Sequence, residues 1–183
     1  ISFDSDLWEI IILSLYVSIS ALIIASILGL LIGYYIALKK FFFKSFILIV
    51  LNSLMGIPPV VVGLIVYFMF ASGGPFGVMQ LLYTPTAMII AQVIIIFPIV
   101  TSISHEIFDQ NWREYKDQLR SINMPFFGVA FIITKHSYFL VITALLSAFG
   151  RAISEVGAVM IVGGNIDRCT RVMTTAISLE TRM

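Results

Sequence analysis

Charged residues are scarce in this chain of 183 residues, at 11%, whereas soluble domains carry about 25%. From Ser45 to Ser104 there is no Asp, Glu, Lys or Arg at all. Hydrophobic residues make up 60% of the chain, and its mean hydropathy is +1.04. Because no soluble fold can bury this much apolar side chain, we predict that most of the chain lies in lipid.

Residues that carry most catalytic and metal chemistry are also few. The chain has one cysteine, Cys169, which excludes an internal disulfide and a cysteine-rich metal cluster. His105 and His136 are far apart in sequence, so neither a zinc motif nor a metal site is predicted. Phosphate-binding glycine loops, serine-nucleophile signatures and long basic runs are missing as well. We therefore predict no enzyme and no nucleic-acid partner, and we interpret Cys169 and His105 as structural or surface residues.

Apolar segments of membrane length predict an all-α, polytopic helical bundle that forms a single domain over residues 1–183. The expected spans are about residues 9–38, 45–71, 85–104 and 126–163. Gly29 and Gly33 in the first span form a G-x-x-x-G spacing. Such a pair either seats a neighbouring helix or arises by chance in an apolar segment.

The distribution of basic residues predicts the orientation. Lys39, Lys40 and Lys44 follow the first span, whereas the residues before it are acidic. Lys- and Arg-rich short loops remain cytoplasmic, so the N-terminus is expected outside the cell membrane. The basic residues after the third span again fall inside under this topology, and fewer fall outside: Arg168, Arg171 and Arg182.

The second span contains a predicted break. Its middle reads MGIPPVVVG, with Pro58, Pro59 and Gly63. Paired prolines remove two backbone donors and push the preceding residue out of the helical region, so the helix must break or kink. Irregular backbone at membrane depth persists where protein or a water-filled cavity satisfies it. The break is therefore either a simple kink between packed half-helices or part of a transport path.

A short polar segment, FDQNWREYKDQLRSIN, separates the third and fourth apolar segments at about residues 108–123. Trp112, Tyr115 and Leu119 lie at helical spacing on one predicted apolar stripe. The opposite face is predicted to carry Glu114, Lys116, Asp117 and Arg120. An amphipathic helix on the inner leaflet would explain the stripe, but balanced charges gain little from anionic lipid. We therefore favour a cytoplasmic helix that docks on a protein partner.

Arg151 and Glu155 form an opposite-charge pair in an otherwise apolar segment. They are four residues apart in the predicted helix and therefore lie on one face. Ionisable groups within a bilayer usually face a bundle interior or a cavity. The pair is thus either a structural ion pair or part of a path.

At this point the motifs resemble a known family. GRAISEVGAVMIVGGN (Gly150 to Asn165), the polar helix before it and the PPVVVG break resemble permease subunits of type I ABC importers, in the molybdate, tungstate and sulfate branch. The strings NSLMGIPPVVVGLIVYF and YTPTAMIIAQVIIIFPIVTSISHEIF look most like tungstate permeases. The resemblance covers nearly the whole chain.

The resemblance implies a MetI-like helical fold of five spans, so one more span is expected after Met183. It implies a pair of permease copies, a cytoplasmic ATPase dimer that uses ATP and Mg, and an outer binding protein that delivers a tetrahedral oxyanion. No cofactor is expected on this chain. The family's E-A-A motif is degenerate here, because Tyr115 and Lys116 follow Glu114. Asn123 stands near the motif's glycine and tolerates a left-handed turn.

The resemblance also implies roles for individual residues. Those expected to dock the ATPase are Trp112, Arg113, Glu114, Tyr115, Lys116, Asp117, Leu119, Arg120, Ile122 and Asn123. Those expected at the path or gate are Pro58, Pro59, Gly63, Arg151, Ser154, Glu155 and Gly157. Those expected to meet the binding protein, or to be ordinary outer-loop residues, are Asn165, Arg168 and Arg171.

Two alternatives remain open. One is an ABC permease for molybdate, sulfate or another solute, which the anion site of the binding protein would discriminate. The other is a membrane scaffold or an ion-coupled carrier. A carrier needs intramembrane ligands for its coupling ion, and the first three spans offer no ionised group.

Overall fold

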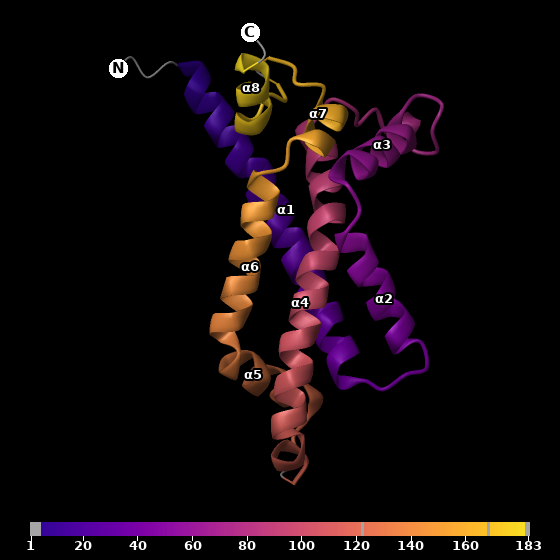
Figure 1. Cartoon of the computed structure of the whole chain (residues 1–183), viewed down its shortest axis with the longest axis vertical. Coiled ribbons are helices and arrows are strands. Elements are labelled where there is room, and N and C mark those ends of the chain that lie inside the picture. The colour runs from indigo at the N-terminus through magenta and orange to yellow at the C-terminus, as the bar shows by residue number, and fades with distance from the viewer. Residues whose placement is uncertain (1–4, 122, 168, 182–183) are drawn as a thin grey trace.

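The computed structural model describes residues 5–121, 123–167 and 169–181. All regular structure within these residues is helical, as the apolar composition predicted. The elements in chain order (Figure 1) are α1 (Ser5–Leu38), α2 (Lys44–Met55), α3 (Pro59–Phe70), the 3₁₀ helix η1 (Gly77–Met79), α4 (Pro85–Ser121), α5 (Phe126–His136), α6 (Tyr138–Ile153), α7 (Gly157–Gly163) and α8 (Met173–Glu180). Ile122, Arg168, Arg182 and Met183 lie outside the described residues.

Two of the described helices are long and apolar enough by themselves to cross a membrane, over Leu7–Leu38 and Pro85–Leu119. Two further pairs, α2 with α3 and α5 with α6, reach that length only when each bent pair counts as one span. By length and composition the described chain thus has two to four candidate spans.

Close packing of α1 on α4 forms the centre of the bundle. A Cβ added to Gly33 would lie 2.9 Å from the carbonyl oxygen of Thr101, and one on Gly29 would lie 2.9 Å from Cγ1 of Val100. Both glycines therefore allow α4 to approach the backbone of α1. The structure therefore supports the interpretation in which the G-x-x-x-G glycines accommodate a neighbouring helix.

The predicted break in the second apolar segment is present. Helix α2 ends at Met55, α3 begins at Pro59, and the two are bent by 99°. Pro59 occupies the first turn of α3, where a missing backbone N–H has no cost. The Gly56 N–H donates to the carbonyl oxygen of Ser53 at 3.1 Å, which closes α2. As a result α3 leaves the direction of α2 (Figure 1) and packs against α7.

The helix ends differ from the predicted segment boundaries in two places. The third span and the polar helix were expected to be separate at about residues 85–104 and 108–123, but α4 is one helix from Pro85 to Ser121. No glycine or proline lies between Ser104 and Phe108 to interrupt it. The fourth predicted span, at about residues 126–163, is three helices, with a 75° bend at Ser137 and a second break at Ser154 to Val156.

Long-range hydrogen bonds fix the last helix to the start of the chain. The Met173 N–H donates to Oγ of Ser14 on α1 at 2.7 Å. Oγ1 of Thr174 donates to the carbonyl oxygen of Glu155 at 3.0 Å. Helices α7 and α8 and the first turns of α1 consequently share one end of the molecule, and α5 and the last turns of α4 share the other (Figure 1).

Candidate functional site

The polar end of α4 carries an exposed charged face. Arg113, Glu114 and Asp117 are exposed, and Lys116 is half-buried. The segment from Phe108 to Ser121 continues the same helix that crosses the apolar region. A force applied to this face would therefore act directly on a membrane-spanning helix.

The aromatic stripe of this segment faces the protein itself. Leu119 is buried, and Trp112 and Tyr115 pack against a core that includes Phe108 of α4 and Ile133 of α5. The rings of Tyr115 and His136 have centroids 5.1 Å apart. The stripe therefore packs against this chain's own core on one side, while Trp112 and Tyr115 stay half-exposed. Docking of the stripe on a partner stays a prediction, and the charged face is the more exposed part of the segment.

The left-handed turn predicted at Asn123 is present, with φ of 47°. The Met124 N–H donates to the carbonyl oxygen of Leu119 at 3.3 Å, and the Met124 side chain packs against the cluster that contains Leu119. This bond and this contact are those of a Schellman C-cap, with Asn123 in the position that glycine usually takes. The turn ends α4 and directs the chain into α5.

Helix α5 is an element that the sequence interpretation missed, because its residues were assigned to the fourth span. It is held against α1, α4 and α6 by Val129 and Ile133. Phe131, Thr134 and Lys135 are exposed. The signal that could have revealed the bend is the polar trio Lys135, His136 and Ser137 between two apolar runs. Together, the segment Arg113–Ser121 of α4 and helix α5 form what we call the inner end of the molecule.

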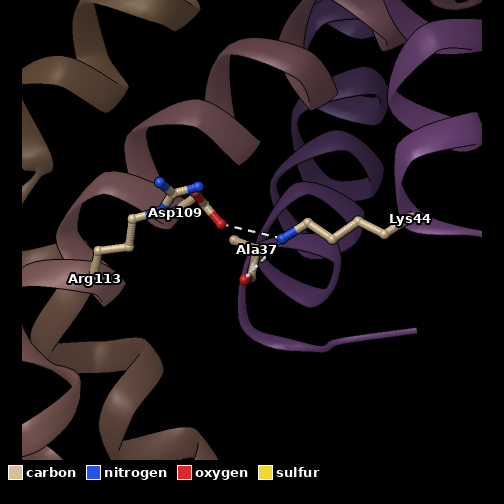
Figure 2. Close-up of polar contacts among 4 residues, drawn as sticks. All are labelled: Ala37, Lys44, Asp109 and Arg113. Carbon is tan, nitrogen blue, oxygen red and sulfur yellow. Dashed lines mark hydrogen bonds and ion pairs between the residues drawn. The ribbon is translucent and has the colours of Figure 1, made fainter. Parts of the chain in front are cut away.

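A three-residue ionic cluster ties this inner end to the start of α2 (Figure 2). Nζ of Lys44 lies 3.1 Å from Oδ1 of Asp109, and it also donates to the carbonyl oxygen of Ala37 at 3.3 Å. Nη2 of Arg113 lies 2.8 Å from Oδ2 of Asp109. The Lys44 and Asp109 side chains are 23% and 17% exposed, whereas Arg113 is 78% exposed. The cluster thus connects α1, α2 and α4 at one point.

The glycines assigned to the path lie in a tight helix contact. A Cβ on Gly63 of α3 would lie 2.6 Å from Cα of Ala158 in α7, and one on Gly157 would lie 2.5 Å from Cγ2 of Val60. Both glycines allow α3 and α7 to touch. Pro58 is exposed and Pro59 half-buried at the turn that precedes this contact.

The predicted pairing of Arg151 with Glu155 on one helix face is wrong. Helix α6 ends at Ile153, and Glu155 lies in the break before α7. Its carboxylate is buried, and Oε1 accepts a hydrogen bond from the Ala158 N–H at 3.1 Å. Arg151 is exposed, and Ser154 donates through Oγ to the Arg151 carbonyl oxygen at 3.1 Å. Loss of helical backbone between the two residues removes the i to i+4 relationship.

The loop after α7 is internally bonded. Asn165 has a left-handed φ of 49°, and the Ile166 N–H donates to Oγ1 of Thr170 at 3.0 Å. Nη1 of Arg171 lies 3.0 Å from Oδ1 of Asp167, so this arginine is partly neutralised. Arg168, the third residue expected to meet a binding protein, lies outside the described residues. Among the described residues no group of His, Cys, Asp and Glu is arranged to hold a metal ion.

Comparison with known proteins defines the class. The model of the family described as "Binding-protein-dependent transport system inner membrane component" matches residues 25–181. The chain belongs to this family, whose members are multi-pass membrane components of ABC uptake systems and work with an ATPase and a substrate-binding protein. It is a transport component and not a catalyst.

Three relatives are similar to this chain over most of its length. The chain is 39% identical, over all of its length and 80% of the relative's, to the tungstate uptake system permease protein TupB of Peptoclostridium acidaminophilum. It is 39% identical to a probable anion ABC transporter permease protein of Haloferax volcanii, over 92% of this chain and 75% of the relative. Identity to the TupB of Campylobacter jejuni is 36%, over 78% of this chain and 59% of the relative.

Proposed function

We propose that this chain is the permease subunit of an ATP-driven importer for a tetrahedral oxyanion, namely tungstate. The observation that carries the proposal is the 39% identity to a tungstate uptake permease over the entire chain. The family supplies the transport class, and the name of the relative supplies the substrate. Molybdate and sulfate share the tetrahedral shape and remain alternative substrates of the same class.

In this proposal two copies of the chain pair around the path, with the N-terminus outside. The inner end of each copy docks on one subunit of an ATPase dimer, which binds ATP and Mg. The binding protein delivers the anion at the opposite end, where the loop from Asn165 to Arg171 lies. Support comes from the exposed charges of Arg113, Glu114 and Asp117 on a helix that continues into the apolar region.

Coupling follows from the continuity of α4. Movement of the inner end by ATPase closure would tilt α4 as one body, because the helix continues from Pro85 to Ser121 through the internal Pro98. Gly29 and Gly33 hold α1 against α4 at backbone distance, so α1 would move with it. The bundle would then alternate between outward-open and inward-open states.

The test uses the full-length permease with its ATPase and binding protein in liposomes. We expect tungstate-loaded binding protein to stimulate ATP hydrolysis. The variant Glu114→Ala with Asp117→Ala should lose this stimulation while its permease still inserts and its ATPase retains basal activity. The control Glu180→Ala removes an exposed charge at the opposite end of the molecule and should behave as wild type.

Two outcomes separate the parts of the proposal. Unchanged stimulation in the double variant would remove the docking role of the charged face. Stimulation by molybdate- or sulfate-loaded binding protein but not by tungstate would retain the importer and overturn the substrate.

A further inference from the structure

A pocket of about 330 Å³ lies beside the break between α2 and α3. Apolar side chains from α1, α2, α3 and α4 line it, among them Leu28, Met55 and Ile94. Arg151 of α6 is the one charged residue that reaches it. The pocket thus has one guanidinium in a lining that is otherwise apolar, on a residue that is exposed at the surface.

The positive charge of Arg151 has no counter-charge within the described part of the chain. Its guanidinium forms no ion pair there, and the carboxylate of Glu155 is used by the Ala158 N–H. The segments from Ile10 to Leu38 and from Ser45 to Ser104 have no acidic residue to offer. Because Arg151 is exposed, its charge is open to solvent or to a ligand. An anion that enters the pocket would meet this one positive charge in an otherwise apolar lining, where a charge without a partner is costly.

Among the described residues no acidic side chain lines the pocket. Within the pocket, the partners open to this guanidinium are therefore water and a mobile anion. A guanidinium suits an oxyanion, because its planar fork of donors can bind two oxygen atoms at once.

The pocket has a neighbour along α2. This second cavity, of about 490 Å³, has polar lining residues that include Asn52, Ser102 and His105, and charged ones, which are Glu106, Asp109 and Arg113. Leu48, Asn52 and Met55 follow one face of α2 at intervals of about one turn, and the first two line the second cavity while the third lines the first. The two cavities therefore share one seam between α2 and α4.

We propose that Arg151 is an anion subsite in the membrane-embedded part of the transport route, where it binds the tetrahedral oxyanion as it passes the break between α2 and α3. This inference rests on the proposed function. Two permease copies would contribute two such guanidinium groups, which matches the double negative charge of tungstate. The subsite lowers the cost of moving a dianion through an apolar pocket.

The first test measures tungstate uptake into liposomes that contain the full-length permease, its ATPase and its binding protein. We expect Arg151→Gln to lower uptake about tenfold or more, an effect typical of losing a desolvated charge partner. Arg151→Lys should retain a larger part of the activity. Stimulation of the ATPase by loaded binding protein should persist in both variants, because neither change touches the inner end. The control is Lys40→Gln, which removes an exposed charge in the loop between α1 and α2.

A second test holds the fold constant and varies only the charge. Arg151→Cys is made in a Cys169→Ser background, because Cys169 is the chain's one cysteine, and that background is first shown to transport. Modification with aminoethyl methanethiosulfonate adds a positive charge and should restore uptake. The negatively charged sulfonatoethyl reagent and the neutral methyl reagent should not.

The outcomes distinguish this inference from the proposed function. Equal uptake by Arg151→Gln and wild type, or equal restoration by all three reagents, would overturn the anion subsite and leave the importer intact. Failure of the wild-type complex to take up tungstate, molybdate or sulfate would overturn the proposed function, and the subsite with it.

Discussion

Nζ of Lys44, at the first residue of α2, lies 3.1 Å from Oδ1 of Asp109 on α4. The charge-free segment lies between these two residues in the sequence. Their contact therefore joins the two ends of that segment. Lys44 also donates to the carbonyl oxygen of Ala37 near the end of α1. The contact therefore links three helices next to the inner end, where the proposed ATPase force would act.

Removal of Asp109 should destabilise the protein more than removal of Lys44. With Lys44→Gln the Asp109 carboxylate retains Arg113, whereas Asp109→Asn removes the charge that both cations share. We expect Asp109→Asn to cost about 1–3 kcal/mol, the usual cost of leaving a partly buried polar group without its partner. The measurement is unfolding of the purified permease in mixed micelles.

The matched control is Arg113→Gln. Because its side chain is 78% exposed, its loss should change stability by about 0.5 kcal/mol or less. Equal effects of all three changes would contradict the ordering. A double-mutant cycle between Lys44 and Asp109 would show whether the pair is coupled.

The turn at Asn123 should accept glycine but not valine. Its φ of 47° lies in the left-handed region, which costs a β-branched residue about 1–2 kcal/mol and glycine nothing. Asn123→Gly should retain stability and ATPase stimulation. Asn123→Val should lower both, because it displaces α5 from the end of α4. Wild-type stimulation in Asn123→Val would show that the orientation of α5 is not needed for coupling.

Two glycine-to-alanine changes should have opposite effects. A Cβ on Gly63 would meet the backbone of Ala158 at 2.6 Å, whereas nothing lies within 4 Å of a Cβ on Gly150. Gly63→Ala should therefore destabilise the packing of α3 on α7 by about 1–3 kcal/mol. Gly150→Ala, within helix α6, should stabilise the protein by about 0.5–1 kcal/mol. Thermal unfolding of both variants checks the signs, and a stabilised Gly63→Ala would contradict the contact.

Glu155 should behave as a cap and not as a transport charge. Its Oε1 accepts the Ala158 N–H, and glutamine retains a carbonyl oxygen for this bond. Glu155→Gln should therefore retain both stability and tungstate uptake, whereas Glu155→Ala should lose about 1–3 kcal/mol because a buried donor is left unpaired. Loss of uptake in a stable Glu155→Gln protein would show that the charge of Glu155 is needed for transport.

Local patterns in the sequence predicted the features that depend on few residues. The paired Pro58 and Pro59 break the second apolar segment, because proline acts on its own and the preceding backbone. Asn123 adopts the left-handed turn for the same kind of local reason. The G-x-x-x-G spacing indicated a close helix contact but left open whether a neighbour would use it.

Sequence patterns did not predict the features that depend on distant residues. The stripe of Trp112, Tyr115 and Leu119 was correctly placed on one face, but the core that covers it comes from α1, α5 and α6. No local pattern reveals that such a stripe also packs against the chain's own core. Arg151 and Glu155 do not share a helix face, because α6 ends between them. A hydrogen bond from Thr174 of α8 to the Glu155 carbonyl oxygen stabilises this break.

By itself the sequence determined that this protein is a helical membrane protein, where its second apolar segment breaks and which segment is polar. These properties follow from hydropathy and from backbone chemistry within a few residues. Only the tertiary structure decided that α4 is one continuous helix, that α5 lies beside its end and that Arg151 lines an apolar pocket with no ion pair among the described residues. Those features depend on which surfaces meet across the bundle, and packing between segments far apart in sequence determines them.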